Sequence, residues 1–258
     1  MTRRSRSRRR QLKASHQKNW LIGRHAVTET LAAGVWKVDE LYLSTDLQAT
    51  EREHLLQLAD DKVRVHLESA DRIAQLCHAD HHQGVAARMA AFEYAEETLL
   101  TDLPSSSLIV ICDRIQDTHN FGAILRCCDA LGADAVVVGD SEQSRITPQV
   151  ARSSAGAVNF IPIVIAASLT ECAERLQADG VCIVGASEHS ENTIWDATLT
   201  GPVGLVIGNE AAGIAPDLLA LCDVEVRVPM LGKVPSLNAA VAAGILLYEI
   251  ARQRGYSN

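Results

Sequence analysis

The 258-residue sequence lacks the marks of membrane, secreted and common nucleotide-binding proteins. Its longest nearly unbroken apolar run, residues 239–247, is about half of the roughly 20 residues that a membrane span needs. Its seven cysteines form no CxxC pair, and an odd, scattered set argues for a reducing compartment and against a disulfide framework. Neither a GxGxxG fingerprint nor a GxxxxGK(S/T) loop is present, which disfavours nicotinamide oxidoreductases and P-loop enzymes. We therefore expect no membrane segment and a cytoplasmic protein.

Acidic side chains are missing from the start of the chain. The first is Glu29, whereas residues 1–18 hold eight of the 24 lysines and arginines. The remaining residues carry 16 cationic side chains against 32 acidic ones, so a basic arm precedes an acidic body. Basic runs of this kind usually stay disordered and contact polyanions. A solubilising tail explains the arm equally well, and a transit peptide fits less well because the stretch has almost no apolar face.

What is present is an ordinary globular composition, 47% hydrophobic and 22% charged, over a length that suits one large domain or two small ones. Alternating helical and strand patterns predict a small α/β domain at residues 19–92, and a Glu-, Ser- and Pro-rich stretch predicts a linker at residues 93–106. Residues 107–258 alternate continuous apolar strands with helices, which predicts a parallel sheet covered on both faces. The expected strands of this larger domain are residues 108–112, 135–138, 160–165, 181–186, 203–207 and 224–228. The expected helices are residues 123–131, 148–155, 169–178, 216–221 and 237–252.

Polar motifs follow three of these strands, at the sheet edge where parallel sheets bind ligands. The first follows strand 108–112, where Asn120 can cap a helix that carries Arg126 about one turn inside. The second follows strand 203–207, where two glycines flank Glu210. The third follows strand 224–228, where a loop with Pro, Gly and Lys brings Ser236 and Asn238 to the start of a long apolar helix, whose unpaired N–H groups attract anions. Each motif alone also describes an ordinary capped turn.

In this order, the three motifs resemble those of the SpoU (TrmH-like) family of RNA 2′-O-ribose methyltransferases, over about residues 21–254. Residues 22–27 and 82–85 resemble the small, ribosomal-protein-like substrate-binding domain of the branch that methylates a 23S rRNA guanosine. The resemblance implies a deep trefoil knot in the parallel-sheet methyltransferase domain. It also implies S-adenosyl-L-methionine (AdoMet) as methyl donor and a homodimer packed through the knotted regions. No sequence pattern by itself predicts a knot.

The resemblance assigns two sets of site residues. The catalytic set is Asn120, Arg126, Glu210, Ser236 and Asn238. The cofactor set, largely backbone groups, is Gly208, Val228, Met230, Gly232 and Leu237. Thr118 stands where the family often has Pro, and Ala211 where it often has Gly, which affects loop geometry but removes no proposed chemical group.

The family precedent assigns activation of the ribose 2′-hydroxyl to Arg126. Because a guanidinium has a pKa above about 12 and is a poor base, we favour an electrostatic role, in which Arg126 holds the adjacent phosphate and stabilises the developing alkoxide. Proton transfer to a perturbed Arg126 is the alternative. Asn120, Ser236 and Asn238 would orient the ribose and the arginine. Glu210 would fix the loops or pair with Arg126, and no metal is required.

RNA contacts are expected at cationic side chains, which otherwise are ordinary solvated surface. These are Arg24, His25, Arg88, Arg152 and Lys233. A second polar group, Cys77, His78, Asp80, His81 and His82, matches no zinc-ligand spacing, so we expect no metal site there.

We therefore expect an AdoMet-dependent enzyme that methylates rRNA, at a guanosine of bacterial 23S rRNA. Three alternatives stay open: methylation of tRNA or of another rRNA nucleotide, a non-catalytic RNA-binding ribosome-assembly factor on the same fold, and a small-molecule α/β enzyme. The small N-terminal domain favours rRNA over tRNA, and the absent nucleotide fingerprints disfavour the small-molecule enzyme.

Overall fold

The computed structural model describes residues 19–104, 106–234 and 236–255. The predicted basic arm, residues 1–18, lies outside the described residues. The chain forms two compact units. The N-terminal unit consists of Met1–Glu93 with Ile146–Phe160, and the C-terminal unit consists of Tyr94–Arg145 with Ile161–Asn258. Within the described part of the chain, no helix is long and apolar enough to cross a membrane.

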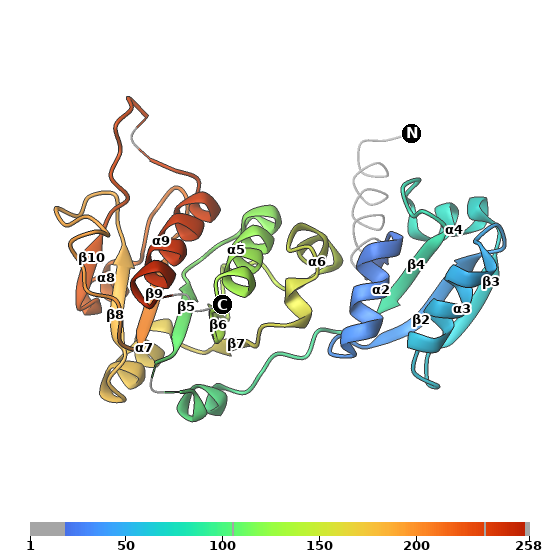
Figure 1. The fold of residues 1–258 in the computed structure, drawn as a ribbon, viewed down its shortest axis with the longest axis horizontal. Helices are drawn as coiled ribbons and strands as arrows, with labels where there is room; N and C mark the ends of the chain where they lie inside the picture. Colours follow the sequence, from blue (N-terminus) through green and yellow to red (C-terminus); the bar gives the residue numbers. More distant parts are fainter. Residues whose placement is uncertain (1–18, 105, 235, 256–258) are drawn as a thin grey trace, which may run out of the picture. The chain divides into compact units, whose positions relative to one another are not determined.

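The N-terminal unit contains a four-stranded sheet with the order β1-β4-β2-β3 (Figure 1). β1 and β2 each pair with β4 in antiparallel fashion, and β3 is parallel to β2. Trp20 and Ala86 of the sheet pack against Ile73 and Cys77 of α4 in one core cluster. The elements of this sheet and its helices are β1 (Trp20–Ile22), α2 (Arg24–Ala33), β2 (Val38–Ser44), α3 (Ala49–Leu58), β3 (Arg64–Glu68), α4 (Ala70–Cys77) and β4 (Val85–Met89).

The same unit includes a later segment, Ile146–Phe160, which contains α6 (Pro148–Ser153) and the 3-10 helix η2 (Ala157–Asn159). The buried Asn159 donates a hydrogen bond from Nδ2 to Thr30 Oγ1 of α2, 3.2 Å away. Sequence spacing alone placed this segment in the larger domain, because a strand-and-helix pattern does not show which unit a helix packs against. The domain division made from the sequence stays a prediction.

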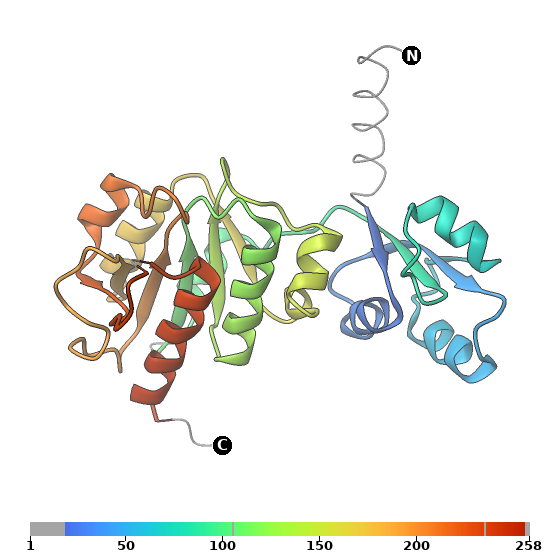
Figure 2. The ribbon, with the colours of Figure 1, turned by 90° about the horizontal axis from the view of Figure 1, so that it is seen from above.

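The C-terminal unit contains a six-stranded sheet in which every pair is parallel, with the order β10-β8-β9-β5-β6-β7. This confirms the predicted parallel-sheet α/β domain; the knot stays a prediction. Figures 1 and 2 show α5 and α9 side by side on one face of the sheet, with α7 and α8 on the other. The strands and helices of this unit are η1 (Glu97–Asp102), β5 (Leu108–Cys112), α5 (Thr118–Ala130), β6 (Ala135–Gly139), β7 (Ile163–Ala166), α7 (Leu169–Ala178), β8 (Cys182–Ala186), β9 (Val203–Ile207), α8 (Pro216–Leu221), β10 (Val224–Val226) and α9 (Ala239–Gln253).

Side chains on alternate positions of the strands fill the two faces of this sheet. Ile109 and Ile111 of β5 join Leu176 of α7 and Leu218 of α8 in one core cluster. On the opposite face, α9 comes close to α5 at Gly244, where an added Cβ would lie 3.2 Å from Cys127 Sγ. The sheet is therefore covered on both faces, and the carboxyl ends of its strands are left to carry the loops described next.

Candidate active site

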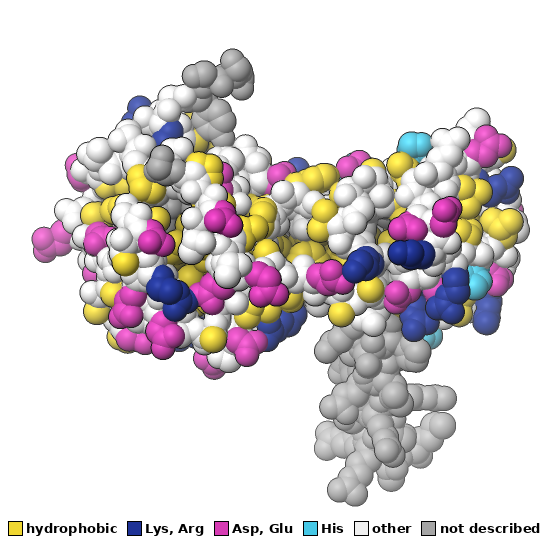
Figure 3. Space-filling view, turned by 90° about the horizontal axis from the view of Figure 1, so that it is seen from below, with side chains coloured by type: hydrophobic (Ala, Val, Ile, Leu, Met, Phe, Trp, Pro, Cys, Tyr) yellow, Lys and Arg dark blue, Asp and Glu magenta, His cyan; other side chains and the backbone are white. Residues whose placement is uncertain are grey.

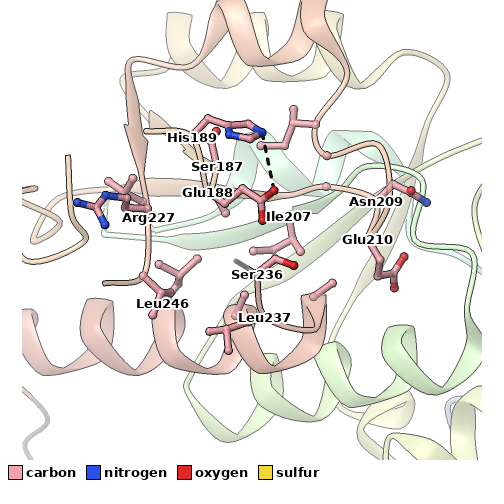
Figure 4. Close-up of a pocket in the computed structure, with 18 of the residues that line it drawn as sticks. Ser187, Glu188, His189, Ile207, Asn209, Glu210, Arg227, Ser236, Leu237 and Leu246 are labelled. Atoms are coloured by element: carbon pink, nitrogen blue, oxygen red, sulfur yellow. Dashed lines mark ion pairs between the residues drawn. The ribbon is translucent and has the colours of Figure 1, made fainter. Parts of the chain in front are cut away.

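The loops that follow β5, β8, β9 and β10 meet because parallel strands end at the same edge of a sheet. The loops after β8, β9 and β10, with the start of α9, enclose a cavity of about 390 Å³ (Figure 4). Ile207, Ile214, Val226 and Leu246 give it apolar walls. Its polar lining includes the side chains Ser187, Glu188, His189, Asn209, Glu210, Arg227 and Ser236.

The first motif opens α5 in a way that the sequence did not predict. Asp117, not Asn120, caps the helix: its Oδ1 accepts from the backbone N–H groups of His119 and Asn120, at 2.8 and 2.9 Å. Our expectation that Asn120 caps α5 is wrong, because Asp117 moves the helix start to Thr118 and places Asn120 in the first turn. The amide of Asn120 is therefore available for contacts between loops.

Asn120 connects the other two motifs. Its Nδ2 donates to Glu210 Oε1 at 2.6 Å, and its Oδ1 accepts from Asn238 Nδ2 at 2.9 Å. Asn238 also caps α9, since its Oδ1 accepts from the backbone N–H groups of Ala240 and Val241 at 3.0 and 3.3 Å. An amide carries both a donor and an acceptor, so two asparagines in series fix each other and the carboxylate. Three loops that are distant in sequence are thus tied into one site.

A second set of contacts holds the loop that carries Glu210. Asn209 and Gly213 exchange backbone hydrogen bonds at 3.1 and 2.9 Å. The Asn209 side chain accepts from two further N–H groups of this loop and donates to the Arg114 carbonyl at 2.9 Å. The buried Asp113 holds Arg114 through two hydrogen bonds of 3.0 Å and accepts from Ala215 N–H at 2.7 Å. Hydrogen bonds therefore connect the loop after β5 to the loop after β9, which carries Glu210.

Gly208 shows how closely these loops approach each other. An added Cβ would lie 2.4 Å from the backbone carbon of Gly213 and 2.4 Å from the nitrogen of Ile214. Neither atom belongs to a flexible side chain, so any other residue would displace the loop. The requirement for glycine here is steric.

Two members of the predicted catalytic set lie outside this network. Ser236 lines the cavity and is exposed, and it makes no hydrogen bond with the described residues. Arg126 is exposed on α5 and forms neither a hydrogen bond nor an ion pair within the described chain. Within the described chain Glu210 accepts from Asn120 and makes no ion pair with Arg126, and its role in the reaction stays a prediction.

The predicted cofactor residues lie mostly at the cavity. Gly208, Val228, Met230 and Leu237 line it, whereas Gly232 is not among its lining residues. Sequence reasoning missed Ser187, Glu188 and His189, although they follow β8 at the same sheet edge that located the other motifs. Glu188 Oε1 lies 3.7 Å from His189 Nε2, the contact dashed in Figure 4.

The predicted RNA contacts lie at the surface. All five side chains are exposed, four on the N-terminal unit and Lys233 on the C-terminal unit. Arg24 pairs with Glu51, His25 lies 3.8 Å from Glu29, and Arg152 donates to Gln149. Arg88 contacts Glu40 at 3.3 Å. Among the described residues, no group of three His, Cys, Asp or Glu side chains is arranged to hold a metal ion.

Comparison with known proteins now identifies the family. The profile described as the SpoU rRNA Methylase family matches residues 107–248. The chain belongs to this family. A second profile, described as RNA 2′-O ribose methyltransferase substrate binding, matches residues 20–95. This confirms the predicted family, its two-part architecture, and an RNA 2′-O-ribose methyltransferase as the class of enzyme.

Full-length relatives support the SpoU assignment. The chain is 34% identical to the 23S rRNA (guanosine-2′-O-)-methyltransferase RlmB of Ralstonia nicotianae, over 91% of this chain and 95% of the relative. It is 33% identical to a putative TrmH family tRNA/rRNA methyltransferase of Staphylococcus saprophyticus, over 92% and 96%. The structure is similar to that of the SpoU methyltransferase AviRb from Streptomyces viridochromogenes in complex with AdoMet. That match has a TM-score of 0.78 and 29% identity, over 91% of this chain and 90% of AviRb.

The cavity of this SpoU chain suits AdoMet, the expected cofactor. Its volume falls within the range of small-molecule sites, about 300–1,000 Å³. Apolar walls suit an adenine ring, and the carboxylates of Glu188 and Glu210 suit ribose hydroxyls and a cationic sulfonium. The residues present thus fit the cofactor that the family uses.

Proposed function

We propose that this protein transfers the methyl group of AdoMet to the 2′-hydroxyl of a guanosine in 23S rRNA. The observation that carries the proposal is the contact chain from Glu210 through Asn120 to Asn238, which joins the three motifs beside the cavity. The RlmB relative supports the choice of nucleotide. The substrate-binding profile over residues 20–95 supports an RNA substrate. We further propose that the protein works in the cytoplasm, where ribosomes are.

Different residues at the cavity would bind different parts of the cofactor. The backbones at Gly208, Val228 and Leu237 would hold the cofactor, with Met230 beside them, since all four residues line the cavity. Glu188 would accept hydrogen bonds from hydroxyl groups. When bound, AdoMet supplies a methyl group on a sulfonium, and its reaction needs the attacking oxygen in line with the departing sulfur. The cross-linked loops below Glu210 provide the rigidity for that alignment.

The catalytic residues act by orientation and by charge. Asn120 donates to Glu210 and accepts from Asn238, so it positions the loops, and the second N–H of its amide is not used by these two contacts. Ser236 can contact the ribose. Arg126 keeps all five N–H donors for RNA, since none is used within the described chain. We assign Arg126 the phosphate contact and stabilisation of the alkoxide, with the proton leaving through phosphate or water.

We also propose that the protein is a homodimer through the C-terminal unit. Val241, Ile245 and Tyr248 form an exposed apolar stripe on α9 at helical spacing. α9 packs beside α5, the helix that carries Arg126. A second copy covering the stripe would approach Arg126, so that residues of both chains could serve one site. Sedimentation of the Ile245→Asp variant tests this: a dimer that becomes a monomer supports the proposal, and an unchanged sedimentation coefficient contradicts it.

Methyl transfer from tritiated AdoMet tests the function itself. The assay compares unmodified 23S rRNA, 16S rRNA and a tRNA pool, followed by mapping of the modified nucleotide. Label in 23S rRNA at a guanosine 2′-oxygen is the expected result. Label in tRNA or at another nucleotide favours the first alternative. RNA binding without label, together with no AdoMet binding by calorimetry, favours a ribosome-assembly factor.

A further inference from the structure

A charged row crosses the sheet of the N-terminal unit. The strand register places Arg88 of β4 opposite Glu40 of β2, and Glu40 opposite Arg64 of β3. Residues that are paired across neighbouring strands point to the same face of a sheet. Arg88, Glu40 and Arg64 therefore lie side by side on one face, although they are 24 and 48 positions apart in the chain.

Glu40 organises this row. Only 10% of its side chain is exposed, and its Oε1 accepts from Arg64 Nη2 at 2.7 Å and from Arg88 Nη1 at 3.3 Å. Its Oε2 accepts from the hydroxyl of Tyr42 at 2.6 Å. Tyr42 in turn stacks on His66, with ring centroids 4.6 Å apart and an interplanar angle of 16°. Both carboxylate oxygens are thus used, and the residues around them are fixed.

The two guanidinium groups remain open to solvent. The side chains of Arg64 and Arg88 are 68% and 50% exposed, and each uses one N–H group on Glu40. A guanidinium has five such donors, so most of them face outward. Because both arginines bind the same oxygen, two positive charges are brought close together against one negative charge. The row carries a net charge of about +1 and presents fork-shaped donors that match phosphate.

A purely structural explanation accounts poorly for this arrangement. Exposed ion pairs contribute only about 0–1 kcal/mol to stability, and a second arginine on the same oxygen adds repulsion from the first. Two adjacent positive charges, by contrast, attract an anionic ligand. In the space-filling view, Lys and Arg side chains gather with histidine on the N-terminal unit, although the chain as a whole is acidic (Figure 3).

We propose that Arg64 and Arg88, positioned by Glu40, bind backbone phosphates of the RNA substrate beside the part of this face that packs against α4. The proposal rests on the function proposed above and specifies where the substrate-binding unit contacts RNA. Arg88 was expected from the sequence to bind RNA, whereas Arg64, Glu40 and Tyr42 were not. Phosphate contacts fix register and orientation without reading sequence, which suits a unit that presents RNA to a separate catalytic site.

The test compares Arg64→Gln/Arg88→Gln with Arg72→Gln/Lys62→Gln, which removes two exposed cations from α4 and a loop of the same unit. Affinity for a 23S rRNA fragment is measured against salt concentration. We expect the first variant to bind about tenfold more weakly at low salt, with a slope of log K against log salt reduced by about 1–2, since each phosphate contact contributes about 0.7–0.9. KM for RNA should rise while AdoMet affinity stays unchanged. The control variant should resemble the wild type.

Three results overturn the proposal or separate it from the proposed function. Equal affinities and salt slopes for the two variants, with wild-type thermal unfolding of both, would mean that this row does not bind RNA. A loss of affinity for a protein partner but not for RNA would assign the face to protein contact and also overturn it. If the wild type binds RNA through these arginines yet transfers no methyl group, the inference stands and the proposed function fails.

Discussion

Two small networks, one in each unit, use a carboxylate in opposite ways. In the C-terminal unit, Glu210 accepts a hydrogen bond from the amide of Asn120, and Asn120 accepts one from the amide of Asn238. In the N-terminal unit, Glu40 accepts hydrogen bonds from two guanidinium groups and a phenol hydroxyl. The first network is built from neutral amides and carries only the charge of Glu210, whereas the second brings cations together.

The two units differ in how they use charged side chains. A neutral amide chain transmits orientation between loops without attracting phosphate, which leaves the reacting hydroxyl to be positioned and Arg126 as a separate, exposed cation. The arginine row holds charge outward and needs no loop, because strand register supplies its geometry. Under the two proposals, the C-terminal network orients the reacting groups and the arginine row of the N-terminal unit adds attraction for RNA. Four variants break or sharpen this contrast.

The largest effect is expected at Arg126, the cation of the orienting unit. Arg126→Ala should lower the rate of methyl transfer on the order of 10²–10³-fold, as removal of one transition-state donor does, and leave AdoMet affinity within about twofold. Arg126→Lys, which keeps the charge but not the fork, should recover part of the rate. Single-turnover transfer and calorimetry measure the two quantities. A wild-type rate in Arg126→Ala would mean that the charge of Arg126 does not contribute to methyl transfer and that orientation of the substrates accounts for the rate.

The next effect tests whether orientation depends on loop packing. A Cβ at Gly208 would meet the backbone of Gly213 and Ile214 at 2.4 Å, so Gly208→Ala should shift the Glu210 loop. We expect AdoMet affinity to fall by tenfold or more and unfolding free energy to fall by about 1–3 kcal/mol, the usual cost of overpacking. Gly201→Ala is the matched control, because no atom lies within 4 Å of its added Cβ. Calorimetry and thermal unfolding of both variants measure this. Equal affinities would show that the loop tolerates the displacement.

The same contrast explains what the sequence could predict. Glu210, Ser236 and Asn238 were found because strand ends in a parallel sheet converge, so a motif after each apolar strand is already a candidate site. The strand register that places Arg64 opposite Glu40 could not be predicted from the sequence. It depends on how the two strands pair in the fold, and a separation of 24 residues does not indicate that pairing.

One wrong expectation, the cap of α5, and one difference between the sequence pattern and the packing have a similar origin. Asn120 and Asp117 are both good helix caps, and the choice between them depends on which side chain another loop requires. The segment Ile146–Phe160 reads as part of the larger domain, and only its packing, with Asn159 against Thr30, assigns it to the N-terminal unit. Side-chain partners from distant loops decided both cases.

A smaller effect concerns the stability of the arginine row. The hydrogen bond from Tyr42, followed by the charges of Arg88, Arg64 and His66, lowers the pKa of Glu40 below its ordinary value of 4.5, against the effect of its burial. A lowered pKa in the folded state contributes stability above the unfolded-state pKa, and this is lost as pH falls through the folded pKa. Glu40→Gln should therefore cost no more than about 1 kcal/mol at pH 7, because the two arginines are exposed, and the difference should shrink below about pH 4.5. Urea unfolding at several pH values measures it; a difference independent of pH would mean that the charge of Glu40 contributes nothing.

The smallest effect is expected from the basic arm, and it tests whether RNA attraction is confined to the folded unit. Residues 1–18 carry eight cationic side chains, so their deletion should weaken RNA binding most at low salt and flatten the salt slope, because counterion release contributes most there. The rate at saturating RNA should not change, since orientation belongs to the other network. If the arm and the Arg64/Arg88 pair bind separate phosphates, the two changes in slope should add when the deletion and the double variant are combined. A deletion that leaves the slope unchanged would make the arm a solubilising tail, and the sheet face of the N-terminal unit would then have to supply the attraction that an acidic body needs to hold RNA.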